Sequence, residues 1–433
     1  MASAPRSAAF RSPLTHASAL LLLSGLALLL TGCKGFFSCE GKSDCPCVAG
    51  TTTNTSSTPT ETVTTTVTTT CTSATGTSTG TSTGTGTSTS TSTTTNSNSS
   101  DFVYVSNDAI SENNVDGYAI SGSTLNAISG SPFDFQYPPS AMVVDPGNSL
   151  LFAATDSELT EGFLYGYSIT SGALGILDSG TPLVSESVTS LAISPDGSWL
   201  FALDTDGTTL EEYSINPSTG ALTFIDTYPV SGTSTGIVTP TQVVVAPSGD
   251  FIVVTLGTGG ANTFTFDTTT GIATPSTLIS PVTDASGIFG AAVDENNNIY
   301  LAGTAGLEVF SATAVGVPTL LNTYTTGNGA HAVAINPDYT YVYVGNLTDG
   351  TISAFSIGTD AALTAINGSP FPGPPTVSAL SVDSTSGYLV AAGYSATNGV
   401  ELYTIGSGGV LTEAASEGTG TSPEVPVALA LTQ

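Results

Sequence analysis

A short apolar run, rich in β-branched and aromatic residues, recurs along the chain from Phe102 to the last residue. It reads FVYVS at Phe102, LFAAT at Leu151, LFALD at Leu200, FIVVT at Phe251, IYLAG at Ile299, YVYVG at Tyr341 and YLVAA at Tyr388. Successive runs begin 49, 49, 51, 48, 42 and 47 residues apart. That period fits four short strands with their turns, which make one blade of a β-propeller. The pattern predicts an all-β fold of seven four-stranded antiparallel blades.

One complete copy shows how a blade is built. Residues 190–194 (SLAIS) alternate apolar and small side chains and end in a Pro-Asp-Gly turn at 195–197. WLFALD follows from Trp199, then TLEEYSI, and a turn at 216–220 leads into ALTFIDTY. Turn residues stand where the chain must reverse, so the copy reads as an antiparallel meander.

The two ends of the repeat region complement each other. The first copy begins at its second strand, FVYVS, whereas a strand of the first type, VALAL at 427–431, stands alone at the C-terminus. We expect this strand to complete the blade that begins at Phe102. Pairing of the two ends would close the ring by hydrogen bonds and leave no open face between blades.

The repeats resemble those of a known family. YVYVGN at Tyr341, FVYVSN at Phe102, the Pro-Asp-Gly turn at Pro195 and the paired segments LNAISGSPF (125–133) and LTAINGSPF (363–371) look like the YVTN-type repeats of lactonase-like seven-bladed β-propellers. The resemblance covers essentially all of residues 101–433. It implies the propeller fold and a ligand-binding channel mouth.

The N-terminal segment predicts export and lipid attachment. Residues 1–33 carry Arg6 and Arg11 before an apolar stretch too short to span a bilayer, and end in Leu-Thr-Gly-Cys, which resembles a bacterial lipobox. Cleavage before Cys33 would leave a lipidated N-terminus anchored in a membrane. Because Lys34 follows, where an aspartate often retains lipoproteins in the inner membrane, an outer-membrane location in the bacterial cell envelope is favoured.

Between this anchor and the propeller lie two further segments. Residues 34–50 form a cysteine-containing segment; Cys39, Cys45, Cys47 and the later Cys71 are candidates for disulfides in an oxidising compartment. Their spacing is too tight for the usual zinc site. Residues 51–100, almost entirely Thr, Ser, Gly and Asn, predict a disordered tether, because they lack the apolar surface that offsets the entropy of ordering.

Charge excludes several classes of partner. The four Lys and Arg residues all precede residue 43, whereas 31 of the 34 carboxylates lie in residues 101–433. Nucleic acid is therefore excluded as a partner, since binding it requires Lys or Arg against phosphates. Phosphorylated substrates are disfavoured for the same reason, because proteins bind phosphate groups mainly with Arg and Lys. Because carboxylates lose their charge on acidification, we also expect a propeller that tolerates acid.

His331 is the sharpest single candidate for chemistry. It stands in GAHAVAINPD, immediately before an expected inner strand, and is the one histidine of residues 101–433. Lactonase-like relatives often carry an Arg-His pair at this point of the repeat, and here Ala330 replaces the Arg. An imidazole titrates near neutrality and could activate water against a lactone carbonyl. Structural packing is the alternative role. Glu424 is expected at the same mouth as a second catalytic residue.

Other polar residues are expected around this mouth. Candidate ligand-binding hydroxyls are Ser140, Ser190, Thr241 and Ser378, each beside the start of an inner strand. Asp156, Glu158 and Glu161 share one loop and form a possible Ca²⁺ site, with a solvated acidic loop as the alternative. No other cofactor is expected. The acidic run at 294–298 occupies a turn position, and we interpret it as a turn.

Two function classes follow. The first is a binding or interaction module of the cell envelope that holds a small molecule, a glycan or an envelope protein. The second is a hydrolase of a neutral lactone, of the phosphogluconolactonase type but without the cations that would bind phosphate. Residues 101–433 contain no Lys or Arg, and His331 is their one histidine. Both facts favour the first class.

Overall fold

The computed structural model describes residues 101–109, 112–155, 162–205, 208–233, 237–281, 287–312, 318–395, 397–418 and 428–433. The predicted signal peptide, lipobox, cysteine segment and tether lie outside the described residues. Among those described, no helix is long and apolar enough to span a bilayer. The only helical turns in this part are two short 3-10 segments, Asp178–Gly180 and Thr359–Ala361.

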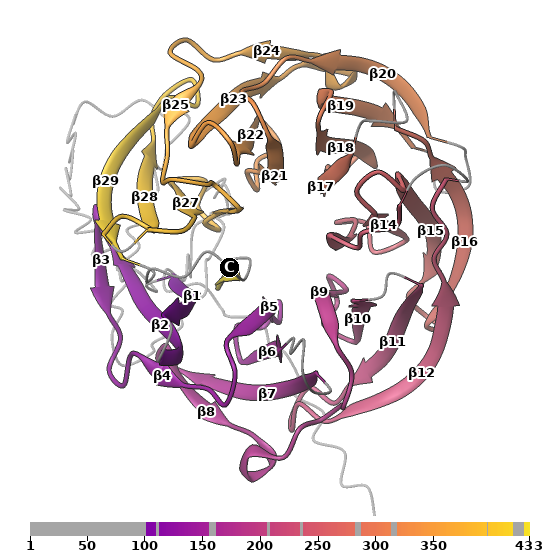
Figure 1. Cartoon of the computed structure of the whole chain (residues 1–433), viewed down its shortest axis with the longest axis vertical. Helices are drawn as coiled ribbons and strands as arrows, with labels where there is room; N and C mark the ends of the chain where they lie inside the picture. The colour runs from indigo at the N-terminus through magenta and orange to yellow at the C-terminus, as the bar shows by residue number, and fades with distance from the viewer. Residues whose placement is uncertain are drawn as a thin grey trace, which may run out of the picture. The chain divides into compact units, whose positions relative to one another are not determined.

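Seven antiparallel sheets, here called blades 1 to 7, surround a central channel (Figure 1). Blade 1 combines both chain ends; from the channel outward it holds β30 (Leu429–Leu431), β1 (Phe102–Ala109), β2 (Glu112–Ser121) and β3 (Thr124–Ala127), with β4 (Phe133–Asp134) also paired to β2. Blade 2 holds β5 (Pro139–Val144), β6 (Leu150–Thr155), β7 (Phe163–Thr170) and β8 (Ala173–Ile176). Blade 3 holds β9 (Val188–Ile193), β10 (Trp199–Asp204), β11 (Thr209–Ile215) and β12 (Leu222–Pro229).

The remaining blades repeat this order. Blade 4 holds β13 (Gln242–Val245), β14 (Phe251–Thr255), β15 (Ala261–Asp267) and β16 (Ile272–Ile279). Blade 5 holds β17 (Ile288–Val293), β18 (Asn298–Gly303), β19 (Gly306–Ser311) and β20 (Thr319–Tyr324). Blade 6 holds β21 (Ala330–Ile335), β22 (Tyr341–Asn346), β23 (Thr351–Ile357), β24 (Leu363–Ala365) and β25 (Phe371–Pro372). Blade 7 holds β26 (Ala379–Val382), β27 (Tyr388–Ala392), β28 (Val400–Ile405) and β29 (Leu411–Glu417). The prediction of a seven-bladed propeller is confirmed.

The C-terminal strand closes the ring, as the sequence predicted. In β30, Leu431 pairs with Val103 of β1 and Leu429 pairs with Val105. Further bonds flank this ladder: Thr432 N–H donates to the Phe102 carbonyl at 3.0 Å, and the Ala428 amide donates to Ser106 Oγ at 2.8 Å. The innermost strand of blade 1 therefore comes from the last residues of the chain. Its other strands come from the beginning of the propeller.

The hydrophobic core is divided among the blade interfaces. Buried apolar side chains in the described residues form seven clusters, each drawn from two neighbouring blades. Tyr104 and Tyr343 are fully buried and reach from one blade into the next, where their hydroxyls donate to the carbonyls of Gly172 (2.8 Å) and Gly409 (3.1 Å). Tyr104 of the FVYVS run and Tyr343 of the YVYVG run therefore stabilise the ring.

A polar side chain fixes the turn after most inner strands. The carboxylate of Asp294 accepts the amides of Asn296 (2.9 Å) and Asn298 (2.8 Å), and Asn336 accepts those of Thr340 and Tyr341. Asp145, Ser194 and Asp383 play the same part in their own turns. The acidic run at 294–298 is a turn, as we interpreted it.

The outer edge of every blade is irregular. A β-bulge interrupts the outer pairing of blades 3, 4, 5 and 7 at the same place. In blades 1 and 6 the outer strand is divided by the segments ISGSPF and INGSPF, whose Ser131 and Ser369 accept amides of the neighbouring strand. In blade 2 the short β8 is followed by a 3-10 turn. Irregular edges oppose pairing of one propeller with another.

Candidate functional site

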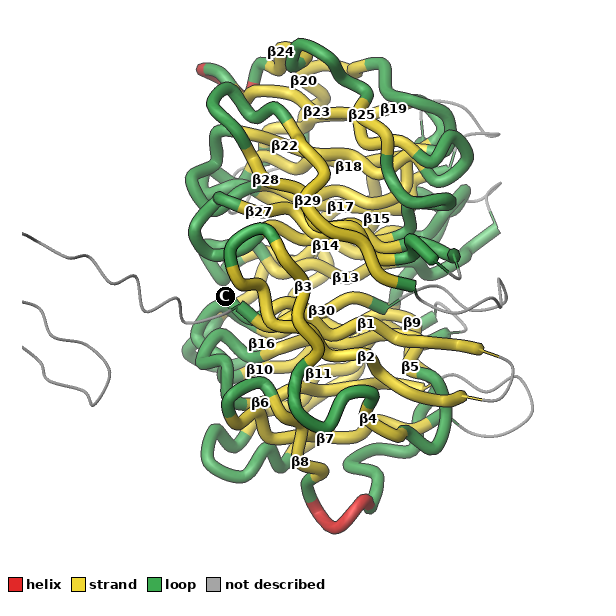
Figure 2. Tube along the Cα trace, turned by 90° about the vertical axis from the view of Figure 1, so that its left-hand side faces the viewer, coloured by secondary structure: helices red, strands yellow, loops and turns green. Residues whose placement is uncertain are grey.

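The channel has two different ends. The inner strands begin at one end, here called the His331 mouth, and finish at the other, here called the proline mouth after Pro146, Pro195, Pro247 and Pro337. In a side view, the β1–β2 hairpin projects at the first end and the C-terminus lies at the second (Figure 2). His331 and the candidate hydroxyls belong to the His331 mouth.

The residues of the His331 mouth occupy β-bulges. In four inner strands the register with the second strand slips by one residue near the start, and the extra residue is Ser140, Thr189, Phe289 or His331. A bulge bends a strand and redirects its side chain. The side chains of these four residues are half-buried. The ring shape thus gathers equivalent residues from different blades at one mouth.

His331 stacks on an aromatic ring of the preceding blade. Its imidazole lies 5.6 Å from the ring centre of Phe289, with 10° between the two planes. Gly290 permits this approach, because a Cβ at its position would lie 2.0 Å from the backbone oxygen of His331. Phe289 and His331 together form a flat, half-buried platform, here called the Phe289–His331 platform.

The imidazole also contacts the following blade. Burial lowers the pKa of His331 below its ordinary value, while a hydrogen bond with the backbone of Ser378 opposes that shift. A ring N–H that donates a hydrogen bond to a carbonyl stabilises the protonated form of histidine. The lowered pKa favours the neutral imidazole, in which one ring nitrogen carries a proton and the other is an acceptor.

The loop before His331 is held by an acidic residue. Asp349 accepts hydrogen bonds from the backbone amide (2.7 Å) and the side-chain amide (3.0 Å) of Asn328, and these bonds hold the pKa of Asp349 below its usual value. Asn328 lies just before β21. The carboxylate thus supports the backbone that leads to His331.

The hydroxyls predicted to bind ligand are engaged with the backbone. Ser140 donates to the Val188 carbonyl of the next blade at 2.9 Å, and Ser378 donates to the Ala392 carbonyl at 3.3 Å. The Thr241 and Thr255 hydroxyls lie 2.7 Å apart. These hydrogen bonds explain why positions 140, 241 and 378 carry hydroxyl side chains, with no need for a ligand.

Ser190 occupies a different position from the other three. It lies one residue beyond the bulge, is buried, and accepts the amide of Val243 in blade 4 at 3.1 Å. The residue of blade 3 that matches His331 is Thr189. A β-bulge cannot be identified from local sequence, and for this reason the sequence pointed to Ser190 instead of Thr189.

The remaining predicted site residues lie outside the described part of the chain. Glu424 belongs to this group, as do Asp156, Glu158 and Glu161 of the proposed Ca²⁺ loop and the lipidation residue Cys33. Within the described residues no group of three or more His, Cys, Asp or Glu side chains is placed to hold a metal ion. For the catalytic, Ca²⁺ and lipid assignments these residues remain predictions.

Sequence reasoning missed a set of buried carboxylates in the third strands. Glu212, Glu308 and Glu401 are at most 5% exposed. Burial raises the pKa of each, and that of Glu212 reaches about 7. Glu212 accepts a hydrogen bond from Tyr228 at 2.7 Å, while its second oxygen is buried without a partner among the described residues. The alternation in TLEEYSI gave no signal of this, because two successive glutamates read as a solvated strand.

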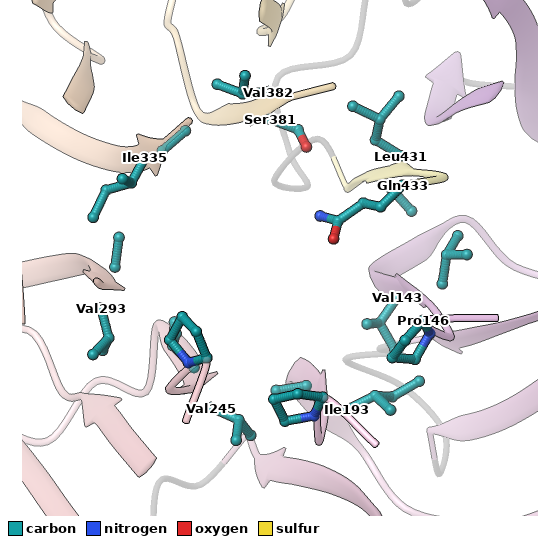
Figure 3. Close-up of a pocket in the computed structure, with 18 of the residues that line it drawn as sticks. Val143, Pro146, Ile193, Val245, Val293, Ile335, Ser381, Val382, Leu431 and Gln433 are labelled. Atoms are coloured by element: carbon teal, nitrogen blue, oxygen red, sulfur yellow. The ribbon is translucent and has the colours of Figure 1, made fainter. Parts of the chain in front are cut away.

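The channel holds a cavity of about 610 Å³, lined by the inner strands and reaching the proline mouth. A ring of branched aliphatic side chains surrounds it (Figure 3), made of Val143, Ile193, Val245, Val293, Ile335, Val382 and Leu431. His331 and Phe289 do not line this cavity. Along β21, four residues separate His331 from Ile335, or about 13 Å of extended strand.

Comparison with known proteins agrees with the fold. Residues 298–426, which include His331, match the family model described as lactonase, 7-bladed β-propeller. A candidate 6-phosphogluconolactonase from Bacteroides uniformis ATCC 8492 superposes with a TM-score of 0.64 at 16% identity, covering 76% of this chain and 99% of its own. The periplasmic gluconolactonase PpgL of Pseudomonas aeruginosa gives 0.62 at 14% identity, with coverage of 76% and 99%. A search of curated proteins found no match.

Proposed function

Taking the chain as a lactonase-like seven-bladed β-propeller, we propose that it is a binding module of the bacterial cell envelope whose ligand is an uncharged small molecule. The ligand sits at the His331 mouth, against the Phe289–His331 platform. Lipid at Cys33 and the tether of residues 51–100 hold the propeller at the outer membrane.

The absence of cationic side chains carries this proposal. From Asp101 to Gln433 the sequence contains neither Lys nor Arg, and His331 is its one histidine. Lowering of the pKa by burial keeps that histidine uncharged at neutral pH. Enzymes and binding proteins hold phosphate mainly with Arg, Lys or metal ions. A phosphorylated sugar lactone, the substrate class named for some of the fold neighbours, would therefore find no Lys or Arg as counter-charge in a propeller that carries 31 carboxylates.

The platform itself suits a neutral ring. Its face is flat and partly apolar, and the free imidazole nitrogen accepts a hydrogen bond from a hydroxyl group. Sugar-derived lactones such as gluconolactone combine an apolar ring face with hydroxyl donors and carry no charge. We therefore take neutral sugar lactones as the ligand class to test first.

Phe289→Ala is expected to weaken binding of glucono-δ-lactone by the full chain at least tenfold, because it removes half of the platform. Titration calorimetry at pH 6, within minutes of dissolving the lactone, measures this. Phe224→Ala is the matched control, since Phe224 is 54% exposed on the outer strand β12. Equal affinity in both variants, or no saturable binding by the unmodified chain, would reject the proposed site.

Hydrolysis of a neutral lactone is the second candidate, and the neutral imidazole is the observation that favours it. With one ring N–H held by Ser378, the other nitrogen is free to take a proton from water as it attacks the lactone carbonyl. Turnover should then fall at least 100-fold in His331→Gln, which keeps a donor for Ser378 but removes the base; this loss is larger than the roughly tenfold weakening of binding expected when one ring of the platform is removed. Turnover that survives this change would exclude His331 as the base; no turnover by the unmodified chain would leave binding alone as the function.

A further inference from the structure

The cavity at the proline mouth has the volume of a small-molecule pocket. Ligand sites enclose about 300–1,000 Å³ and combine apolar walls with placed polar groups. This cavity measures about 610 Å³ and takes its lining from all seven blades. The aliphatic ring described above forms its wall, so the wall offers dispersion contacts in every direction across the channel.

Most polar groups at this mouth are already engaged. The carboxylate of Asp145 accepts backbone amides of its own turn, among them that of Ser149 at 2.7 Å. Asn336 bonds Thr340 and Tyr341. Gln242 lines the same cavity nearer to the His331 mouth, and its side chain accepts the amide of Ala291 at 2.8 Å. Groups tied to the backbone in this way cannot turn toward a ligand without breaking those bonds.

Of the lining side chains, Tyr339 in blade 6, Ser381 in blade 7 and Gln433 beside blade 1 carry neutral polar groups that make no hydrogen bond among the described residues. The Ser381 hydroxyl in blade 7 and the side-chain amide of Gln433, next to β30 of blade 1, both face the opening (Figure 3). The cavity thus offers an aliphatic wall and, on one side, a hydroxyl and an amide. This distribution of polar and apolar groups is complementary to that of an amphiphile.

We infer that the cavity at the proline mouth is a second binding site, which takes an uncharged amphiphile: a hydrocarbon chain enters the aliphatic ring, and a hydroxyl, ester or amide group bonds Ser381 and Gln433. An anionic head group is disfavoured, because the propeller has no Lys or Arg and Asp145 lies at the same mouth. This site is separate from the Phe289–His331 platform. A chain of about eight methylenes, near 10 Å in length, matches the depth of three to four strand residues.

The test uses three probes on the full chain: 1-octanol, 1-butanol and octanoate, each titrated by calorimetry. Octanol is expected to bind saturably with one site per chain, and at least tenfold more tightly than either butanol or octanoate. The first ratio reflects four methylenes, each contributing about 0.8 kcal/mol when buried. The second reflects the uncompensated charge of the carboxylate.

Two substitutions at one position separate the contributions. Ser381→Ala should weaken octanol binding about three- to tenfold, since it removes one hydrogen bond. Ser381→Phe should weaken it further, because its ring also blocks the polar side of the cavity. Ser356→Phe, on β23 away from the channel, is the matched control for added bulk, and thermal melts establish that each variant is folded. Phe289→Ala should leave octanol binding unchanged.

The inference is overturned if octanol does not saturate, if octanoate binds as tightly as octanol, or if a folded Ser381→Phe variant binds octanol normally. Loss of octanol binding in Phe289→Ala would also contradict it, because the two sites would then be one. None of these outcomes depends on whether a lactone binds at the His331 mouth.

Discussion

A chain that lacks residues 428–433 will not form the native propeller. The deletion removes the ladder of β30 on β1, the bonds that Thr432 and Ala428 make to Phe102 and Ser106, and the buried side chain of Leu431. Losing a buried Leu costs about 2–5 kcal/mol and each hydrogen bond about 1 kcal/mol. The total approaches the stability of an ordinary domain, roughly 5–15 kcal/mol.

The measurement is thermal unfolding followed by circular dichroism, with limited proteolysis to locate exposed strands. We expect the truncated chain to lose its cooperative transition and to be cleaved in or near β1. Deleting Gln433 alone is the control; its backbone bonds Asn148, but its side chain is exposed. Leu431→Ala should give an intermediate loss of about 3 kcal/mol. A truncated chain that melts cooperatively at the same temperature would show that the ring does not depend on its last strand.

Glu212→Gln should stabilise the propeller at pH 8 and have little effect at pH 5. Burial is the main cause that raises the pKa of Glu212 to about 7, and the neighbouring charge of Asp226 adds to it. The carboxyl group therefore binds a proton more tightly in the folded chain than in the unfolded one. Its contribution is fully present below its ordinary pKa near 4.5 and is lost as the pH rises through 7. A pKa raised from 4.5 to about 7 corresponds to a loss of about 3 kcal/mol by linkage.

The same sign applies to Glu308 and Glu401, whose pKa values are also raised by burial. The unmodified propeller should accordingly become more stable as the pH falls from 8 to 5, because these three carboxyl groups outweigh the opposite contribution of His331, whose pKa is lowered by burial; this agrees with the acid tolerance expected from composition. Urea unfolding at pH 5, 6, 7 and 8 measures this for the unmodified chain, for Glu212→Gln and for the half-buried neighbour control Glu211→Gln. A stability that falls on acidification over this range, or a pH profile left unaltered by Glu212→Gln, would contradict the assignment.

The fold was predictable because the sequence signals for its strands and turns recur with a regular period. Each blade repeats the same spacing of apolar runs and turn residues, and the missing strand at Phe102 matched the extra strand near Leu431. Closure by the C-terminus followed from counting strand types, without knowledge of any contact. The turn at 294–298 was predictable for the same reason, because it stands where the other blades carry their turns.

The site was less predictable, because it depends on contacts between blades. The β-bulge that redirects His331 and Phe289 is a property of strand pairing, and it shifted the equivalent residue of blade 3 from Ser190 to Thr189. Hydrogen bonds from Ser140 to the backbone of the next blade are likewise invisible in a linear pattern. The stacking of Phe289 on His331 brings together residues 42 positions apart.

The propeller is expected to accept an uncharged ligand and to reject a phosphorylated one. The most direct measurement titrates the full chain in parallel with glucono-δ-lactone and with 6-phosphoglucono-δ-lactone at about 0.15 M salt. We predict saturable binding of the first and at least 100-fold weaker binding of the second, since no side chain from residue 101 onward supplies a fixed positive charge. Binding of the phosphorylated lactone as tight as that of the neutral one would contradict the account.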